Sequence, residues 1–290
     1  MANVLSSKAM LAGLNITQWA ARKVDKKVTR ETNDAHGAAH DAGRYNKALI
    51  AKEALAAIVA AANAARATHY ATTLPWLDNG ARILPAALHT KYANEMRGHR
   101  EAFETAVAAF IGDYDSFVAD ARKRLNGMFE ESDYPAASEI ARRFSFGVNL
   151  YPVPDSADFR VDVSAAAAAA IRAEIQARAD QALETAMRSA WERIAETVGH
   201  MVTKLGEYKP GADGERATGI FRDSLVDNVR ELVAILPGLN LTGNAELAAV
   251  ADRMAALVKH DAEALRVSEA LRTETKAAAE SILETVSAFM

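Results

Sequence analysis

Basic side chains gather in one N-terminal stretch with an aromatic residue beside them: Trp19, Arg22, Lys23, Lys26, Lys27, Arg30, Arg44 and Lys47. Lysine and arginine neutralise the phosphates of a nucleic-acid backbone, and an aromatic ring can stack on the bases of a single strand. If these segments fold together, they predict a binding surface for single-stranded DNA. The alternative is a solvated helix face, or ion pairs with acidic residues elsewhere in the chain.

Two histidines at helical spacing are the only candidate metal ligands of this kind. His36 and His40 would share one face of a helix, and Asp34 or Asp41 could supply a third ligand to a divalent metal. Gly37 lies between the two histidines and argues against a continuous helix. The alternative is therefore a polar loop between two helices.

Two further stretches carry groups that can do chemistry. Glu130, Glu131 and Asp133 place three carboxylates together before Pro135, where they could do acid–base work or start a helix. The segment 206–219 holds four glycines with Lys209 and Arg216 before a helix, so it could bind an anion. A flexible loop between helices is the simpler interpretation of that segment.

Composition excludes several classes of protein. The chain has 290 residues and no cysteine, which excludes disulfides, thiolate zinc sites, iron–sulfur clusters and a cysteine nucleophile. It contains no phosphate-binding loop, nucleophile elbow, zincin or dinucleotide-binding motif. The formal net charge of −4 provides no overall basic field, so any nucleic-acid contact needs a local patch. We expect no enzymatic activity and no cofactor.

The N-terminus lacks the charged head and apolar run of a signal peptide, and no stretch reaches the roughly 18 apolar residues of a membrane span. We therefore expect a cytoplasmic protein without membrane contact.

Apolar periodicity predicts a mainly α-helical fold with long antiparallel helices. Helices are expected from about Arg22 to Gly37 and from about Tyr45 to Tyr70. Apolar residues then recur on one face from about Pro85 to Asn126. Ser164 is the N-cap of a helix to about Leu205, which carries a heptad seam: Met187, Trp191, Ile194, Val198, Met201 and Leu205. Two helices of about forty residues would span about 60 Å each and suggest a projecting stalk.

A small antiparallel sheet is expected as an insert. Apolar and polar residues alternate from Phe144 to Tyr151 and again from Phe159 to Val163, with a proline-rich turn between them. This pattern predicts a β-hairpin at about 144–163. A strand at about 13–19 is its expected third member.

The last stretch, from Ala245 to Phe289, is expected to be a long helix with a bend near His260 and Asp261 that forms an interface between copies of the chain. Its candidate interface residues are Leu247, Val250, Met254, Leu257, Leu271, Ile282 and Phe289. Asp261, Ser268 and Thr275 interrupt the apolar register, and such polar positions can fix the register or the number of partners. The alternative is a partly solvated helix that caps the body.

Several motifs resemble a family of phage and prophage proteins that is described only as a domain of unknown function. They include the stretches LNITQW at 14–19, DAGRYNK at 41–47, GARILPA at 80–86, RLNG at 124–127 and YPVPD at 151–155. The resemblance covers roughly the first 205 residues. It implies a phage-encoded protein in the cytoplasm of the infected or lysogenic bacterial host, and members of the family are sometimes encoded near a MoxR-type AAA ATPase. It carries over no catalytic residue.

The sequence thus predicts a mixed helical domain with a small sheet at 1–207 and a C-terminal helical segment at 208–290. We expect a non-enzymatic, phage-encoded homo-oligomer that assembles through its long helices. The alternatives are a single-stranded DNA-binding protein of phage replication or recombination, and an adaptor of a MoxR-type ATPase.

Overall fold

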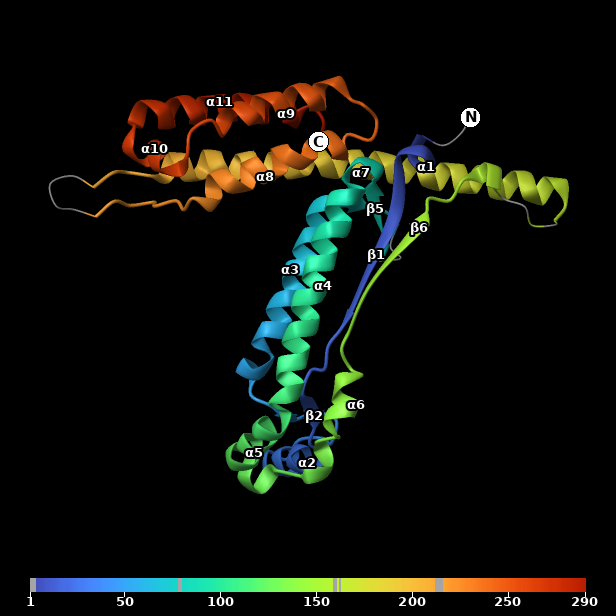
Figure 1. The fold of residues 1–290 in the computed structure, drawn as a ribbon, viewed down its shortest axis with the longest axis vertical. Coiled ribbons are helices and arrows are strands. Elements are labelled where there is room, and N and C mark those ends of the chain that lie inside the picture. The colour runs from blue at the N-terminus through green and yellow to red at the C-terminus, as the bar shows by residue number, and fades with distance from the viewer. Residues whose placement is uncertain (1–3, 78–79, 159–160, 162, 212–215) are drawn as a thin grey trace. The chain divides into compact units, whose positions relative to one another are not determined.

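A computed structural model describes residues 4–77, 80–158, 161, 163–211 and 216–290 (Figure 1). The chain divides into two compact units. Unit 1 comprises Met1–Gly13, Tyr70–Tyr92 and Asn149–Met290, and unit 2 comprises Leu14–His69 and Ala93–Val148. This division does not follow the expected boundary at 207/208, because α7 (Ala165–Glu207) packs against α8 (Ser224–Leu239) within unit 1.

The fold is mainly α-helical, as predicted. Beside α7 and α8, the described residues form the helices α1 (Val4–Lys8), α2 (Lys26–Ala35), α3 (Ala56–Thr72), α4 (His89–Gly112), α5 (Tyr114–Leu125), α6 (Ala137–Ala141), α9 (Ala245–Leu257), α10 (Ala262–Val267) and α11 (Glu269–Ser287). Short 3₁₀ turns lie at Lys52–Leu55, Ala86–Leu88, Asn126–Met128, Glu131–Asp133 and Ser156–Asp158.

The small antiparallel sheet is also present, with a composition that differs in part from the prediction. Its four strands lie in the order β4 (Leu74–Pro75), β5 (Arg82–Pro85), β1 (Ala9–Thr17) and β6 (Ser145–Pro152). Strands β1 and β6 correspond to the expected segments at 13–19 and 144–151. The expected return strand falls mostly on residues 159–160 and 162, outside the described residues, and Val161 and Val163 lie in no strand.

Unit 2 is built on α3 and α4, which lie side by side (Figure 1). Their facing sides contribute to one apolar core, which contains Trp19, Leu49, Ile50, Ile58, Ala62, Phe103, Phe110, Tyr114, Ile140 and Phe144. A hydrogen bond of 2.8 Å joins Thr68 Oγ1 and His99 Nε2 across the pair. The expected helix from Pro85 to Asn126 is two helices, since α4 ends at Gly112 and α5 starts at Tyr114.

The 43-residue helix α7 organises unit 1. Ser164 is its N-cap, as predicted, and the Ser164 hydroxyl accepts a hydrogen bond from the Ala167 N–H. Five of the six seam residues, from Trp191 to Leu205, are buried against α8 and α11, while Met187 is half-buried. The expected stalk of two paired long helices is therefore not the arrangement within the units, because α3 is the partner of α4 and α11 covers α7.

The region expected as one helix from Ala245 to Phe289, with a bend near His260 and Asp261, is interrupted at that bend and once more at Ser268. The chain forms α9, α10 and α11 instead, and α9 packs against α11. The Asp261 carboxylate accepts the Ala264 N–H, and the Ser268 hydroxyl accepts the Leu271 N–H. Two of the three polar residues that interrupt the apolar register, Asp261 and Ser268, are thus N-caps that start α10 and α11, whereas Thr275 is buried within α11.

No helix among the described residues combines the length and the apolar character that crossing a membrane requires.

Candidate functional site

The basic N-terminal stretch folds as a short two-stranded β-hairpin with a helix inserted between its strands, all within unit 2. Strand β2 (Arg22–Val24) pairs with β3 (Asn46–Ala48), so that Lys23 lies opposite Lys47. Asp25 then starts α2, because its carboxylate accepts the N–H groups of Lys27 at 3.1 Å and Val28 at 3.0 Å. The expected helix from Arg22 to Gly37 therefore begins only at Lys26.

The hairpin and the helix are tied together by Thr29. The Thr29 hydroxyl donates to the Asp25 carbonyl at 2.5 Å and accepts the Tyr45 N–H at 3.0 Å. The Asp25 N–H in turn donates to the Tyr45 carbonyl at 2.9 Å. These bonds fix the first turn of α2 against the beginning of β3.

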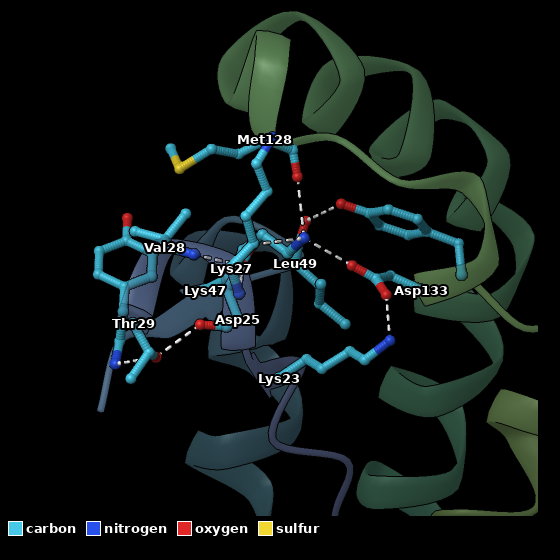
Figure 2. A network of polar contacts seen from close by, with 11 residues as sticks. Lys23, Asp25, Lys27, Val28, Thr29, Lys47, Leu49, Met128 and Asp133 are labelled. Atoms are coloured by element: carbon cyan, nitrogen blue, oxygen red, sulfur yellow. Dashed lines mark hydrogen bonds and ion pairs between the residues drawn. The ribbon is translucent and has the colours of Figure 1, made fainter. Parts of the chain in front are cut away.

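A buried ammonium group lies at the centre of this region (Figure 2). Lys47 is only 2% exposed, and its Nζ lies 2.7 Å from Asp133 Oδ2 and 3.2 Å from Asp25 Oδ2. It also donates to the Met128 carbonyl at 2.8 Å, so three acceptors surround its three N–H groups. The ammonium of Lys23 lies against Asp133 as well, but this lysine side chain is 52% exposed. The network thus has two cations, one in the interior and one at the surface.

The ionised forms of these groups stabilise one another. Burial raises the pKa of Asp133, but the hydrogen bonds from Lys23 and Lys47 outweigh burial and hold that pKa below its ordinary value. The N–H of Val28 is the largest cause that lowers the pKa of Asp25, and Lys47 adds to this effect. Burial lowers the pKa of Lys47, but Asp133 and Asp25 more than compensate, and the pKa is raised.

Two side chains from the neighbouring segments anchor strand β3. Arg124 of α5 donates to the carbonyls of Ala48 and Leu49 at 2.7 and 3.2 Å. The Tyr134 hydroxyl donates to the same Leu49 carbonyl at 3.0 Å. The hairpin therefore rests on a rigid base formed by α5 and the residues that follow it.

A surface groove of about 770 Å³, which we call the basic groove, lies beside the hairpin. Its lining residues are Val24, Lys26, Thr29, Arg30, His40 and Arg44. The side chains of Lys26, Arg30 and Arg44 are exposed and form no ion pair within the described part of the chain. No acidic residue lines this groove, so its cations are available to an anionic ligand.

A second groove, of about 390 Å³, adjoins the basic groove. Val24 and Lys26 line both, and the second groove also contains Lys23, Asp25, Lys27, Lys47, Glu130 and Asp133. The carboxylates of Asp25 and Asp133 are already paired with lysines. The second groove also contains the exposed Glu130, and the exposed cations Lys26 and Lys27 are the lysines that extend the basic surface beyond the first groove, since Lys23 is paired with Asp133.

The structure brings together most of the predicted nucleic-acid-binding residues but separates their roles. Arg22, Lys23, Lys26, Lys27, Arg30 and Arg44 are exposed. Lys47 belongs to the buried network and offers no free charge. Trp19 is 7% exposed and packs against Phe110 and Tyr114 with ring centroids 6.3 and 6.1 Å apart. Its ring lies in the core of unit 2, so it has no face on which a base could stack.

The histidine pair does not share a helix face. Helix α2 ends at Ala35, His36 is its C-cap, and Gly37 has a φ of +61° that an α-helix does not allow. His40 lies in the following turn, with its Nδ1 4.0 Å from Asp34 Oδ1. Among the described residues, no group of three or more His, Cys, Asp or Glu side chains could hold a metal ion.

The three carboxylates at 130–133 do not form one cluster in the structure. Asp133 is buried in the network, whereas Glu130 and Glu131 are exposed. The pairing of Asp133 with Lys47 leaves no local signal in the sequence, because 86 residues separate the two along the chain. The glycine-rich segment 206–219 includes residues 212–215, which lie outside the described residues.

The expected interface residues of the C-terminal region lie inside unit 1. Leu247, Val250, Met254, Leu257 and Ile282 are at most 3% exposed. Leu271 is half-buried, and the Phe289 ring stacks on Trp191 with centroids 4.5 Å apart. The first five side chains therefore belong to the core of unit 1 and are covered by the chain itself, whereas Phe289 remains 37% exposed.

Comparison of the chain with protein-family models, curated proteins and solved structures finds no match. The resemblance to the phage protein family therefore stays a prediction from sequence motifs.

Proposed function

We propose that this protein is a non-enzymatic nucleic-acid-binding protein and that the basic groove of unit 2 holds the phosphate backbone. The observation that carries the proposal is the set of three unpaired cations, Lys26, Arg30 and Arg44, which line one groove from two segments of the chain. Arginine matches the geometry of phosphate oxygens and stays charged at every physiological pH.

Two further features favour a polymer over a small anion. The second groove continues the line of exposed cations through Lys26 to Lys23 and Lys27. Lys23 lies on strand β2, which pairs with β3, and Lys26 and Lys27 lie in the first turn of α2, which Asp25 and Thr29 bond to Tyr45, so little backbone freedom is lost on binding. A charged track on a rigid base is the arrangement that follows a nucleic-acid backbone.

The test is the salt dependence of binding. Fluorescence anisotropy of a labelled 20-nucleotide oligothymidine should show an affinity that falls steeply between about 50 and 200 mM salt. The double variant R30A/R44A should bind more weakly and reduce the slope of log K against log salt by about 1.4, since each single-strand phosphate contributes about 0.7.

The control variant K52A/R97A removes two exposed cations of unit 2 that line neither groove. It should bind as the unmodified chain does. Equal losses in both double variants would show nonspecific attraction to the surface charge. No binding by the unmodified chain at low salt would overturn the proposal.

Self-association is a second candidate, and one observation favours it. Strand β6 is the last strand in the order of the four-stranded sheet, and its residues Leu150 and Tyr151 are 44% and 50% exposed. An edge strand with apolar side chains can pair with another chain. Light scattering after size-exclusion chromatography tests this, and a strict monomer at micromolar concentration would contradict it. An ATPase partner rests on the family resemblance alone.

A further inference from the structure

Tyr45 is an exposed aromatic residue beside the basic groove. It follows Arg44, which lines that groove, and its side chain is 39% exposed. Its backbone is held on both sides: the N–H donates to Thr29 Oγ1 at 3.0 Å, and the carbonyl accepts the Asp25 N–H at 2.9 Å. Thr29 itself lines the groove. The ring is therefore attached to a fixed point next to the cations.

The described residues offer the Tyr45 ring no polar, aromatic or cationic partner. In the part of the chain that the structure describes, the Tyr45 side chain forms no hydrogen bond, no contact with another aromatic ring and no contact with a cation. An exposed aromatic side chain loses the free energy that burial would provide. A ligand with flat apolar faces could cover the ring and regain part of that free energy.

We infer that Tyr45 stacks on a base and that the basic groove consequently prefers single-stranded over duplex nucleic acid. This inference rests on the proposed function, because the cations of the groove must first hold the backbone. The bases of a duplex are stacked on one another and offer no free face, whereas those of a single strand do. Tyr45 thus takes the role that the sequence suggests for Trp19, whose ring is buried.

The experiment separates bases from phosphates with two matched probes. One is a labelled oligothymidine of 20 nucleotides, and the other is an abasic oligomer with the same number of phosphates. The unmodified full-length chain should bind the oligothymidine more tightly. Y45A should weaken its binding by about 5- to 150-fold, the range of one stacked base, and should change the binding of the abasic oligomer by less than about twofold.

Conservative and distant variants complete the design. Y45F and Y45W keep a flat ring and should retain the affinity for oligothymidine within about threefold. Y151A removes an exposed tyrosine of unit 1 and should change neither affinity. Circular dichroism confirms that each variant keeps its helices.

The possible failures are distinct. Equal affinity of the unmodified chain for the two probes would overturn the stacking of Tyr45 and leave backbone binding in place, and this comparison needs no variant. Equal losses of Y45A on both probes would assign Tyr45 a structural role. A duplex bound as tightly as the single strand would refute the preference. No binding of either probe would overturn the proposed function itself.

Discussion

Replacement of Lys47 by methionine tests whether the buried charge network holds unit 2 together. Methionine keeps much of the apolar stem of lysine but removes the ammonium. Asp133 then keeps only the surface partner Lys23, and Asp25 keeps the N–H groups of Lys27 and Val28. Both carboxylates lie in the interior, with side-chain exposures of 8% for Asp25 and 0% for Asp133.

The expected loss follows from the burial of these charges. Removal of one partner from a buried ion pair typically costs about 3–5 kcal/mol, because the remaining charge is left without compensation. The double variant K47M/D133N also removes one of the two carboxylates. We expect it to be more stable than K47M by about 1–3 kcal/mol, since contacting groups do not act independently.

The assay must report on unit 2 separately from unit 1. The chain has three tryptophans, of which Trp19 lies in unit 2 and Trp76 and Trp191 lie in unit 1. Fluorine NMR of protein labelled with 5-fluorotryptophan should resolve their signals during a urea titration. With a slope of about 2 kcal/mol per molar urea, the Trp19 midpoint should fall by about 1.5–2.5 M in K47M.

Lys52 provides the matched control. It is an exposed lysine in the same unit, and K52M should change stability by less than about 0.5 kcal/mol. The reasoning is refuted if the Trp19 midpoint of K47M stays with that of K52M, or if K47M/D133N is less stable than K47M. A change of the urea midpoint at Trp191 alone in K47M would show that the substitution destabilises unit 1 and not unit 2, which would also contradict the reasoning.

Four other predictions use the same titration. The folded-state pKa values of Asp25 and Asp133 are lowered, so their ionised forms stabilise unit 2 above the unfolded-state pKa of about 3.9. This stabilisation is lost as the pH falls through the folded-state pKa values. The urea midpoint at Trp19 should therefore decrease below about pH 4, and it should decrease less in K47M/D133N. Ser268→Ala removes the N-cap of α11 and should cost about 1 kcal/mol at the Trp191 signal. Truncation after Val258 removes α10 and α11, exposes α7, and should unfold unit 1; a folded Trp191 signal in the truncated chain would contradict this. Gly219→Ala would place a Cβ 2.2 Å from the Glu207 carbonyl oxygen at a φ of +63°, so we expect a loss above about 1 kcal/mol, and an unchanged Trp191 midpoint would speak against it.

The long helices could be predicted from sequence because their signals are local. Ser164 is an N-cap residue directly before a long run of strong helix formers, and the seam from Trp191 to Leu205 repeats at helical spacing. Local signals also misled at one place. The apolar register of α9 continues through Asp261 and Ser268 into α11, and the periodicity alone does not reveal that these two side chains cap new helices.

The candidate site could be predicted only in part, because the burial of its residues depends on contacts with distant parts of the chain. Runs of lysine and arginine identify the basic surface from sequence alone. Burial of Lys47 depends on Asp133, and burial of Trp19 depends on Phe110 and Tyr114, which come from distant parts of the chain. The exposure of Tyr45 is equally invisible in the sequence. Trp19 follows strand β1 and Tyr45 precedes strand β3, and the sequence around each ring does not indicate which of the two is buried.

Burial divides the cations of one short stretch into two groups with separate effects. Lys47 forms ion pairs with Asp25 and Asp133 and therefore contributes to the stability of the hairpin. Arg30 and Arg44 have no such partner among the described residues and contribute to the positive surface potential of the basic groove. Stability and binding should thus respond to different substitutions. R30A/R44A should leave the Trp19 midpoint near that of the unmodified chain, and K47M should lower the midpoint while the folded fraction still binds. If Arg30 and Arg44 had a merely structural role, R30A/R44A would lower the stability of unit 2 and weaken binding together.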